Sequence, residues 1–312
     1  MHGLGRPLIR TAAAERGDDG GQIGLQGSDL LPIVLQVALD PGHAPMDAVL
    51  VIGMGTLLAR QPRDGVRLSA DLAYGEHPRQ RLDVYQPEAA ATGLRPVLVF
   101  VHGGGFVSGA KEDINNGEYG QILRQMDRGY AVVTVNYRLA TQAPFPAARD
   151  DVALAIAHLR ANGATMGLNV GRLIVAGHSA GGSLAAMIGT NPGAPTQFGS
   201  VPRVDEYVAI SPITIFNGDG VAPMPSDFWV PSAQRAAQSP LTTLDPSDPR
   251  GYIIHGDLDG IVPVAHADRF MQKAATAGAK VTFDRVDDGA TSCRNHLPMC
   301  GANAEYLDNW LG

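Results

Sequence analysis

The stretch RLIVAGHSAGGSLAAMIG, residues 172–189, carries the strongest pattern in the chain. Its first part is an apolar run of strand length, and its last part has the composition of a helix. Between them GHSAGG (177–182) matches G-x-S-x-G, with Ser179 at the centre. A sharp turn from strand to helix exposes such a serine as a nucleophile and directs the helix N-terminus at it. The alternative is a Gly-rich tight turn in which Ser179 caps the helix.

A second glycine-rich motif, HGGGF (102–106), directly follows the apolar run PVLVFVH (96–102). Consecutive glycines expose backbone N–H groups without side chains in the way, and such donors can hold an oxyanion. We expect Gly103, Gly104 and the N–H of Ala180 to supply them. A phosphate-binding loop is the competing interpretation, but the Lys-Ser or Lys-Thr ending of a P-loop and a G-x-G-x-x-G pattern are both missing.

Short β-rich runs alternate with helical stretches over most of the chain, which predicts βαβ units and a mostly parallel sheet. The strand candidates are 96–102, 130–137, 172–177, 207–211, 251–256 and 280–286, and the helix candidates are 146–163, 264–278 and 303–311. Residues 66–75 and 81–87 resemble an antiparallel edge hairpin. We expect a mobile tail over 1–28, N-terminal helices over 29–65 and a single domain over 29–312.

Residues 212–244 interrupt this alternation. The segment is rich in Pro and small residues, and it is too long for an ordinary connection. We expect a cap-like excursion over the C-terminal edge of the sheet, where open α/β proteins bind ligands. Phe228 and Trp229 lie in this segment and are candidates to line a substrate pocket, although core packing explains them equally well.

These motifs resemble the α/β-hydrolase superfamily, and most closely the hormone-sensitive-lipase-like and related bacterial carboxylesterases. The resemblance begins near Tyr74 and includes YRLA and FPAARDDV within 137–152. It implies an α/β fold with a mostly parallel central sheet, flanking helices and a small cap or lid. Many close relatives have Asp where this chain has His178, and Glu-His-Pro where it has 142–144. GHSAGG also occurs in formamidase-like and feruloyl-esterase-like groups.

In this fold the catalytic residues follow the order Ser, acid, His. Two acids, Asp257 and Asp259, follow the strand candidate 251–256, and the family's carboxylate three residues before Val-Pro selects Asp259. After the last predicted strand the chain offers one histidine, His296. Structural roles are expected for the others that were weighed, namely His102, His158, His178, His255 and His266.

The resemblance implies a serine carboxylesterase acting on small acyl or aryl esters through an acyl-enzyme, with no metal or organic cofactor. The first alternative keeps the same residues and cleaves an aryl formamide or a feruloyl-type ester. A more remote alternative is a non-catalytic protein of this fold that binds a ligand. Phe106 and His178 join the candidates for the substrate pocket.

Both cysteines of the chain, Cys293 and Cys300, flank His296. A zinc site needs a fourth ligand and usually a closer Cys or His pair, so the pattern argues against metal. The intervening residues include Pro298 and have the character of an exposed loop. That composition favours a disulfide, which would restrain the loop of His296, over two buried free thiols.

The formal net charge of −7 and the lack of a Lys/Arg cluster argue against a nucleic-acid partner. No apolar run approaches the roughly 20 residues that span a bilayer. The N-terminal residues lack the apolar core of a signal peptide, so we expect a cytoplasmic protein unless a leader has been removed. The expected partner is a small ester, and the oligomeric state is not predicted.

Overall fold

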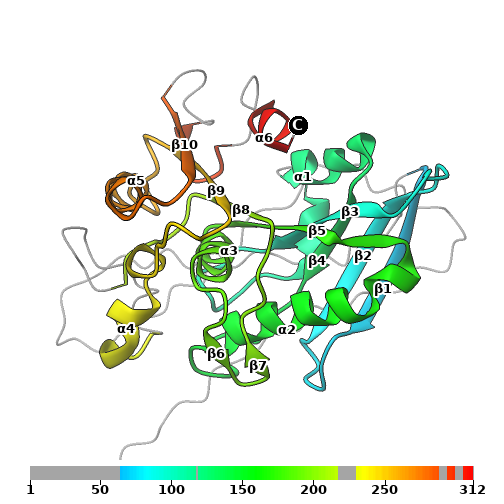
Figure 1. Cartoon of the computed structure of the whole chain (residues 1–312), viewed down its shortest axis with the longest axis horizontal. Coiled ribbons are helices and arrows are strands. Elements are labelled where there is room, and N and C mark those ends of the chain that lie inside the picture. Colours follow the sequence, from blue (N-terminus) through cyan, green and yellow to red (C-terminus); the bar gives the residue numbers. More distant parts are fainter. Residues whose placement is uncertain (1–63, 117–118, 217–229, 288–293, 299–304, 312) are drawn as a thin grey trace, which may run out of the picture. The chain divides into compact units, whose positions relative to one another are not determined.

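The computed structural model describes residues 64–116, 119–216, 230–287, 294–298 and 305–311 (Figure 1). The expected tail over 1–28 and the helices over 29–63 therefore lie outside the described residues. So do Phe228, Trp229, Cys293 and Cys300, which leaves the disulfide and part of the pocket as predictions.

An eight-stranded sheet organises the described residues, in the order β1-β2-β4-β3-β5-β8-β9-β10. The strands β4, β3, β5, β8, β9 and β10 run parallel, whereas β1 and β2 form an antiparallel hairpin at one edge. The bounds are β1 Val66–Ala73, β2 Arg81–Pro87, β3 Arg95–Val101, β4 Ala131–Val135, β5 Leu168–His178, β8 Glu206–Ile210, β9 Arg250–Gly256 and β10 Val281–Val286. The predicted strands and the edge hairpin are confirmed.

Helices cover both faces of this sheet. The helices α2 (Ala147–Asn162), α3 (Ala180–Thr190) and α5 (Ala265–Ala277) contribute to one buried cluster, and α1 (Gly120–Arg124) and α6 (Tyr306–Leu311) contribute to the other. Figure 1 shows α1 and α6 on the side of the sheet opposite α2. The short helix α1 and the small hairpin of β6 (Pro195–Thr196) and β7 (Gly199–Ser200) were not predicted.

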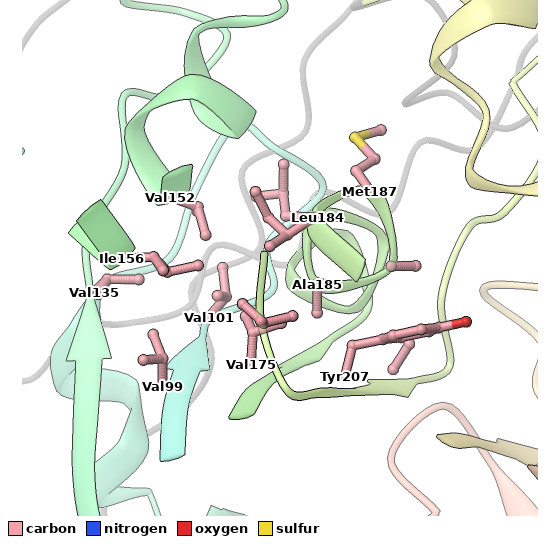
Figure 2. Close-up of a cluster of buried hydrophobic side chains, with 14 of the residues drawn as sticks. Val99, Val101, Val135, Val152, Ile156, Val175, Leu184, Ala185, Met187 and Tyr207 are labelled. Atoms are coloured by element: carbon pink, nitrogen blue, oxygen red, sulfur yellow. The ribbon is translucent and has the colours of Figure 1, made fainter. Parts of the chain in front are cut away.

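Alternate residues of the central strands pack into opposite clusters, because side chains along a strand point to opposite faces. On β3, Val99 and Val101 join one cluster while Leu98 and Phe100 join the other. Figure 2 shows Val99 and Val101 in the layer that also contains Leu184 of α3. Burial on both faces explains why these strands are apolar without alternation.

The segment 212–244 is described only at its two ends. Residues 230–244 hold the short helix α4 (Ser232–Gln238), followed by a 3-10 turn over Pro240–Thr242. Leu241 N donates a hydrogen bond to Thr214 O (3.3 Å), which joins the two ends of the segment. The remainder of the expected excursion, 217–229, lies outside the described residues.

Candidate active site

Ser179 occupies the sharp turn between β5 and α3. Its backbone has φ 54° and ψ −121°, which is a strained conformation for a residue with a side chain. A Cβ atom at Gly177 would lie 2.2 Å from Gly181 O, and one at Gly181 would lie 2.1 Å from Val101 O. Only glycine fits at either position, so the two glycines of the motif allow the turn to form.

The main chain of Ser179 is fixed, and its hydroxyl does not cap the helix. Ser179 N donates to Ile210 O (2.8 Å), and Ser179 O accepts hydrogen bonds from the N–H (2.9 Å) and the hydroxyl (3.1 Å) of Ser183. Within the described part of the chain, the Ser179 side chain makes no capping hydrogen bond to α3. Ser179 therefore occupies the N-cap position of α3 without a side-chain cap, and the helix does not use its hydroxyl.

His296 and Asp259 form a hydrogen-bonded pair at the C-terminal end of the sheet. His296 Nδ1 lies 2.8 Å from Asp259 Oδ2. A carboxylate can only accept, so Nδ1 carries the proton, and the neutral imidazole is left with an unprotonated Nε2. This is the tautomer that a general base needs.

The carboxylate of Asp259 is buried and oriented by its own loop. Its Oδ1 accepts the N–H groups of Ile261 and Val262, both at 2.8 Å. Its Oδ2 also lies 3.1 Å from His255 Nε2. Burial favours a higher pKa for Asp259, but the hydrogen bonds from His255 and His296 outweigh it and hold the pKa well below its usual range. The group is therefore ionised wherever the protein is folded at ordinary pH.

Asp257, the other acid weighed from the sequence, has a different partner. Its Oδ1 accepts a hydrogen bond from Arg294 Nε at 2.7 Å, and the two side chains form an ion pair. Leu258 N also donates to Arg294 O (2.9 Å). Asp257 thus anchors the segment before His296 to the loop after β9.

The backbone of the HGGG motif is oriented by Tyr137. Tyr137 Oη lies 3.1 Å from His102 O and 3.3 Å from Gly103 O. The C=O and N–H of a trans peptide unit point in opposite directions. Holding these two carbonyls therefore turns the N–H groups of Gly103 and Gly104 away from Tyr137.

The same loop lies against the turn at Ser179. A Cβ atom at Gly103 would be 3.3 Å from Ser179 Cβ and 3.1 Å from His178 O. Among the described residues, no loop or turn hydrogen bond uses the N–H of Gly103, Gly104 or Ala180. The structure thus brings the predicted donors together with Ser179 at one end of the sheet.

An apolar pocket adjoins this loop. Phe106 forms one part of its wall. Residues before and at the start of α2, and one from the end of the excursion, form the rest, namely Ala140, Ala143, Phe145, Ala148 and Val230. Phe106 therefore lies in a pocket wall, and its contact with a substrate stays a prediction. His178, the other described pocket candidate, uses both ring nitrogens in contacts within the protein.

Three contacts at the site were not predicted from the sequence, namely those of Tyr137, His178 and His255. Each lies near the end of a strand or just after it. Tyr137 and His178 contact backbone carbonyls more than thirty residues away in the chain, whereas His255 contacts the carboxylate of Asp259, four residues further on. His255 lies one residue before the end of β9 and four residues before Asp259, and its position next to the acid's own loop was the one available signal.

Comparison with known proteins agrees with the fold. The BD-FAE family model matches residues 82–210. Esterase LipC of Mycobacterium tuberculosis is 28% identical over 252 residues, which cover 72% of this chain and 62% of LipC. A truncated carbohydrate esterase from gut microbiota has a TM-score of 0.68 at 23% identity, over 78% of this chain and 94% of that one. Esterase B from Lactobacillus rhamnosis also has a TM-score of 0.68, at 18% identity over 81% of this chain and 85% of that one.

The strand order, the turn at Ser179 and the structural matches show that the chain has an α/β-hydrolase-type fold. The chain spans about three fifths of the length of LipC, with 62% of that protein matched. Helices long and apolar enough to cross a bilayer are not found in the described ranges. Nor do those ranges contain a group of three or more His, Cys, Asp or Glu side chains that could hold a metal ion.

Buried histidines make the fold sensitive to acid. Burial lowers the pKa of His102 and of His178 to about 3, and that of His266 to about 4. An unfolded histidine takes up a proton near its ordinary pKa of 6.5. Below that pH the unfolded chain binds more protons than the folded one, so the free energy of unfolding falls as pH falls.

We expect His266→Gln to lose less stability on acidification than the unmodified protein. Between about pH 7.5 and pH 5 one such histidine costs about 2 kcal/mol of stability, and the variant removes that cost. Urea unfolding at both pH values measures the difference. Equal losses in the two proteins would contradict the buried neutral state of His266.

Proposed function

We propose that this protein is a serine carboxylesterase that hydrolyses small acyl or aryl esters. The observation that carries the proposal is the His296–Asp259 pair, joined at 2.8 Å, together with a serine held at φ 54° by two glycines, whose neighbour His178 contacts the backbone of His296. The relatives named above as esterases support the same chemistry. In this proposal Ser179 is the nucleophile, His296 the general base and Asp259 the residue that orients the base.

The first half of the reaction makes an acyl-enzyme. Ser179 Oγ attacks the ester carbonyl carbon while its proton passes to His296 Nε2. Asp259 stabilises the imidazolium that forms, because it is already ionised. The N–H groups of Gly103, Gly104 and Ala180 hold the developing oxyanion. The C–O bond to the alcohol then breaks, and His296 returns its proton to the leaving alkoxide.

The second half releases the acid. A water molecule gives a proton to His296 Nε2 and attacks the acyl carbon, and the same backbone donors hold the oxyanion again. Collapse of this intermediate breaks the bond to Ser179 Oγ, which takes back the proton. The apolar pocket beside Phe106 is the proposed site for the acyl group, and its small volume suits short chains.

A second candidate keeps these residues and changes the bond that is cleaved, to an aryl formamide or a feruloyl-type ester. Two aromatic side chains in the pocket wall, Phe106 and Phe145, favour a substrate with a ring. The non-catalytic alternative has less support, because the chain keeps a candidate for each of the three catalytic roles, Ser179, His296 and Asp259.

We expect Ser179→Ala to reduce hydrolysis of an activated acetate ester by about 10³-fold or more, since it removes the nucleophile. The measurement is steady-state release of nitrophenol, together with labelling by a fluorophosphonate probe. Ser247→Ala, which changes an exposed serine on a surface turn, is the matched control and retains full activity. An equally active Ser179→Ala protein would rule out the proposal.

We expect Tyr137→Phe to lower kcat by about tenfold or more, because the carbonyls of His102 and Gly103 lose the hydroxyl that orients the backbone donors. KM changes little, since the oxyanion exists only after attack. Tyr130→Phe is the control, as it removes another buried hydroxyl that lies 3.3 Å from a carbonyl, Leu311 O, on the other face of the sheet. Similar kcat values in both variants would refute this role for Tyr137.

A substrate panel separates the two candidates. We expect acetate and butyrate esters to be cleaved with higher kcat/KM than esters of long-chain acids, because the pocket is narrow. Feruloyl esters and N-formyl arylamines belong in the same panel. A kcat/KM for either that exceeds the acetate value by about tenfold would establish the second candidate instead.

A further inference from the structure

His178, the residue before the proposed nucleophile, contacts both the segment of His296 and Tyr119. It is the last residue of β5, and its side chain is buried. One ring nitrogen, Nε2, lies 2.7 Å from His296 O, and the other, Nδ1, lies 3.0 Å from Tyr119 Oη. A carbonyl oxygen can only accept, so Nε2 carries the proton and Nδ1 accepts from the Tyr119 hydroxyl. The two contacts select one tautomer.

This arrangement requires a neutral imidazole, and the surroundings keep it neutral. A doubly protonated ring would lose its acceptor for Tyr119. Burial, followed by the neighbouring His296, lowers the pKa of His178 to about 3. The ring therefore stays neutral at ordinary pH, with its one proton on Nε2 and its Nδ1 free to accept from Tyr119.

The described segment around His296 is attached at two places. Asp257, Leu258 and Asp259, on the loop after β9, hold Arg294 and the His296 ring. The second attachment is His178, which holds the carbonyl of His296 and also packs against its ring, with centroids 4.7 Å apart and a tilt of 57°. The second attachment connects the segment directly to the strand that carries Ser179, and Leu297 adds packing against the buried cluster that includes α1 and α6.

We infer that His178 is a positioning residue that fixes His296 relative to Ser179 through the hydrogen bond from its Nε2–H to the His296 carbonyl. This inference rests on the proposed function. His178 is covalently next to Ser179, so it provides the shortest connection from the nucleophile's strand to the loop of the base. An ionised carboxylate at this position could not donate to a carbonyl, so the contact depends on the imidazole N–H.

The test compares two replacements that differ in one donor. His178→Gln keeps an N–H at the end of the side chain, near the place of Nε2, whereas His178→Leu is of similar size and has none. We expect His178→Leu to lose about 30- to 100-fold in kcat, because a displacement of about 1 Å costs that much. His178→Gln stays within about fivefold of the unmodified protein. KM stays within about twofold in both, since the acyl pocket is elsewhere.

Two controls make the outcome decisive. Thermal melts compare folding, and kcat is counted per site that reacts with a fluorophosphonate. An unchanged kcat in folded His178→Leu, or equal losses in the Leu and Gln variants, would overturn the inference while leaving the esterase proposal intact. An unmodified protein without esterase activity would instead overturn the proposed function.

A third variant covers the case in which His178→Leu does not fold. Tyr119→Phe leaves His178 in place and removes only the hydroxyl that fixes its tautomer. We expect a loss of about three- to tenfold in kcat, with KM unchanged, because the ring is then free to adopt the other tautomer. A kcat equal to that of the unmodified protein would overturn the inference as well.

Discussion

The close approach of α3 to the sheet is the constraint on which the site depends. The start of α3 lies so near β3 and β5 that a single extra carbon at Gly177 or Gly181 would meet backbone oxygen atoms. This packing holds Ser179 in a conformation that an unrestrained chain would leave. It also brings the loop after β3 against the turn, so the backbone donors and the nucleophile share one scaffold. The strain at Ser179 is maintained by the core beneath it, where Val101 and Leu184 pack (Figure 2).

Much of the fold could be read from the sequence because the decisive signals are local. Apolar runs bounded by turns predicted the parallel strands, and the pairing of Ser179 with Gly177 and Gly181 predicted the turn. The partner of His296 required more, since Asp257 and Asp259 fit the loop equally well by position. The family pattern selected Asp259, and the structure shows that this acid contacts the His296 ring while Asp257 binds Arg294.

The supporting contacts could not be predicted, because they join segments that are distant in the chain. Nothing near Tyr137 indicates that its hydroxyl reaches the carbonyls of the loop after β3. Nothing near His178 indicates a contact with residue 296, which is 118 positions away. Contacts of this kind depend on the order of strands in the sheet, and that order is a property of the whole chain. Sequence patterns therefore identify reacting groups more readily than the groups that hold them.

The second histidine at Asp259 has a consequence for motion during turnover. Asp259 receives hydrogen bonds from Ile261, Val262 and His255, all of them from β9 or the loop that follows it. Its charge is consequently stabilised whether or not His296 is in place. In the proposed reaction, the imidazole of His296 could therefore rotate away when an alcohol leaves, and no proton would need to bind the carboxylate in the interval. When the ring returns, it meets an acceptor that is already charged, so no proton has to be removed from Asp259 before the next cycle.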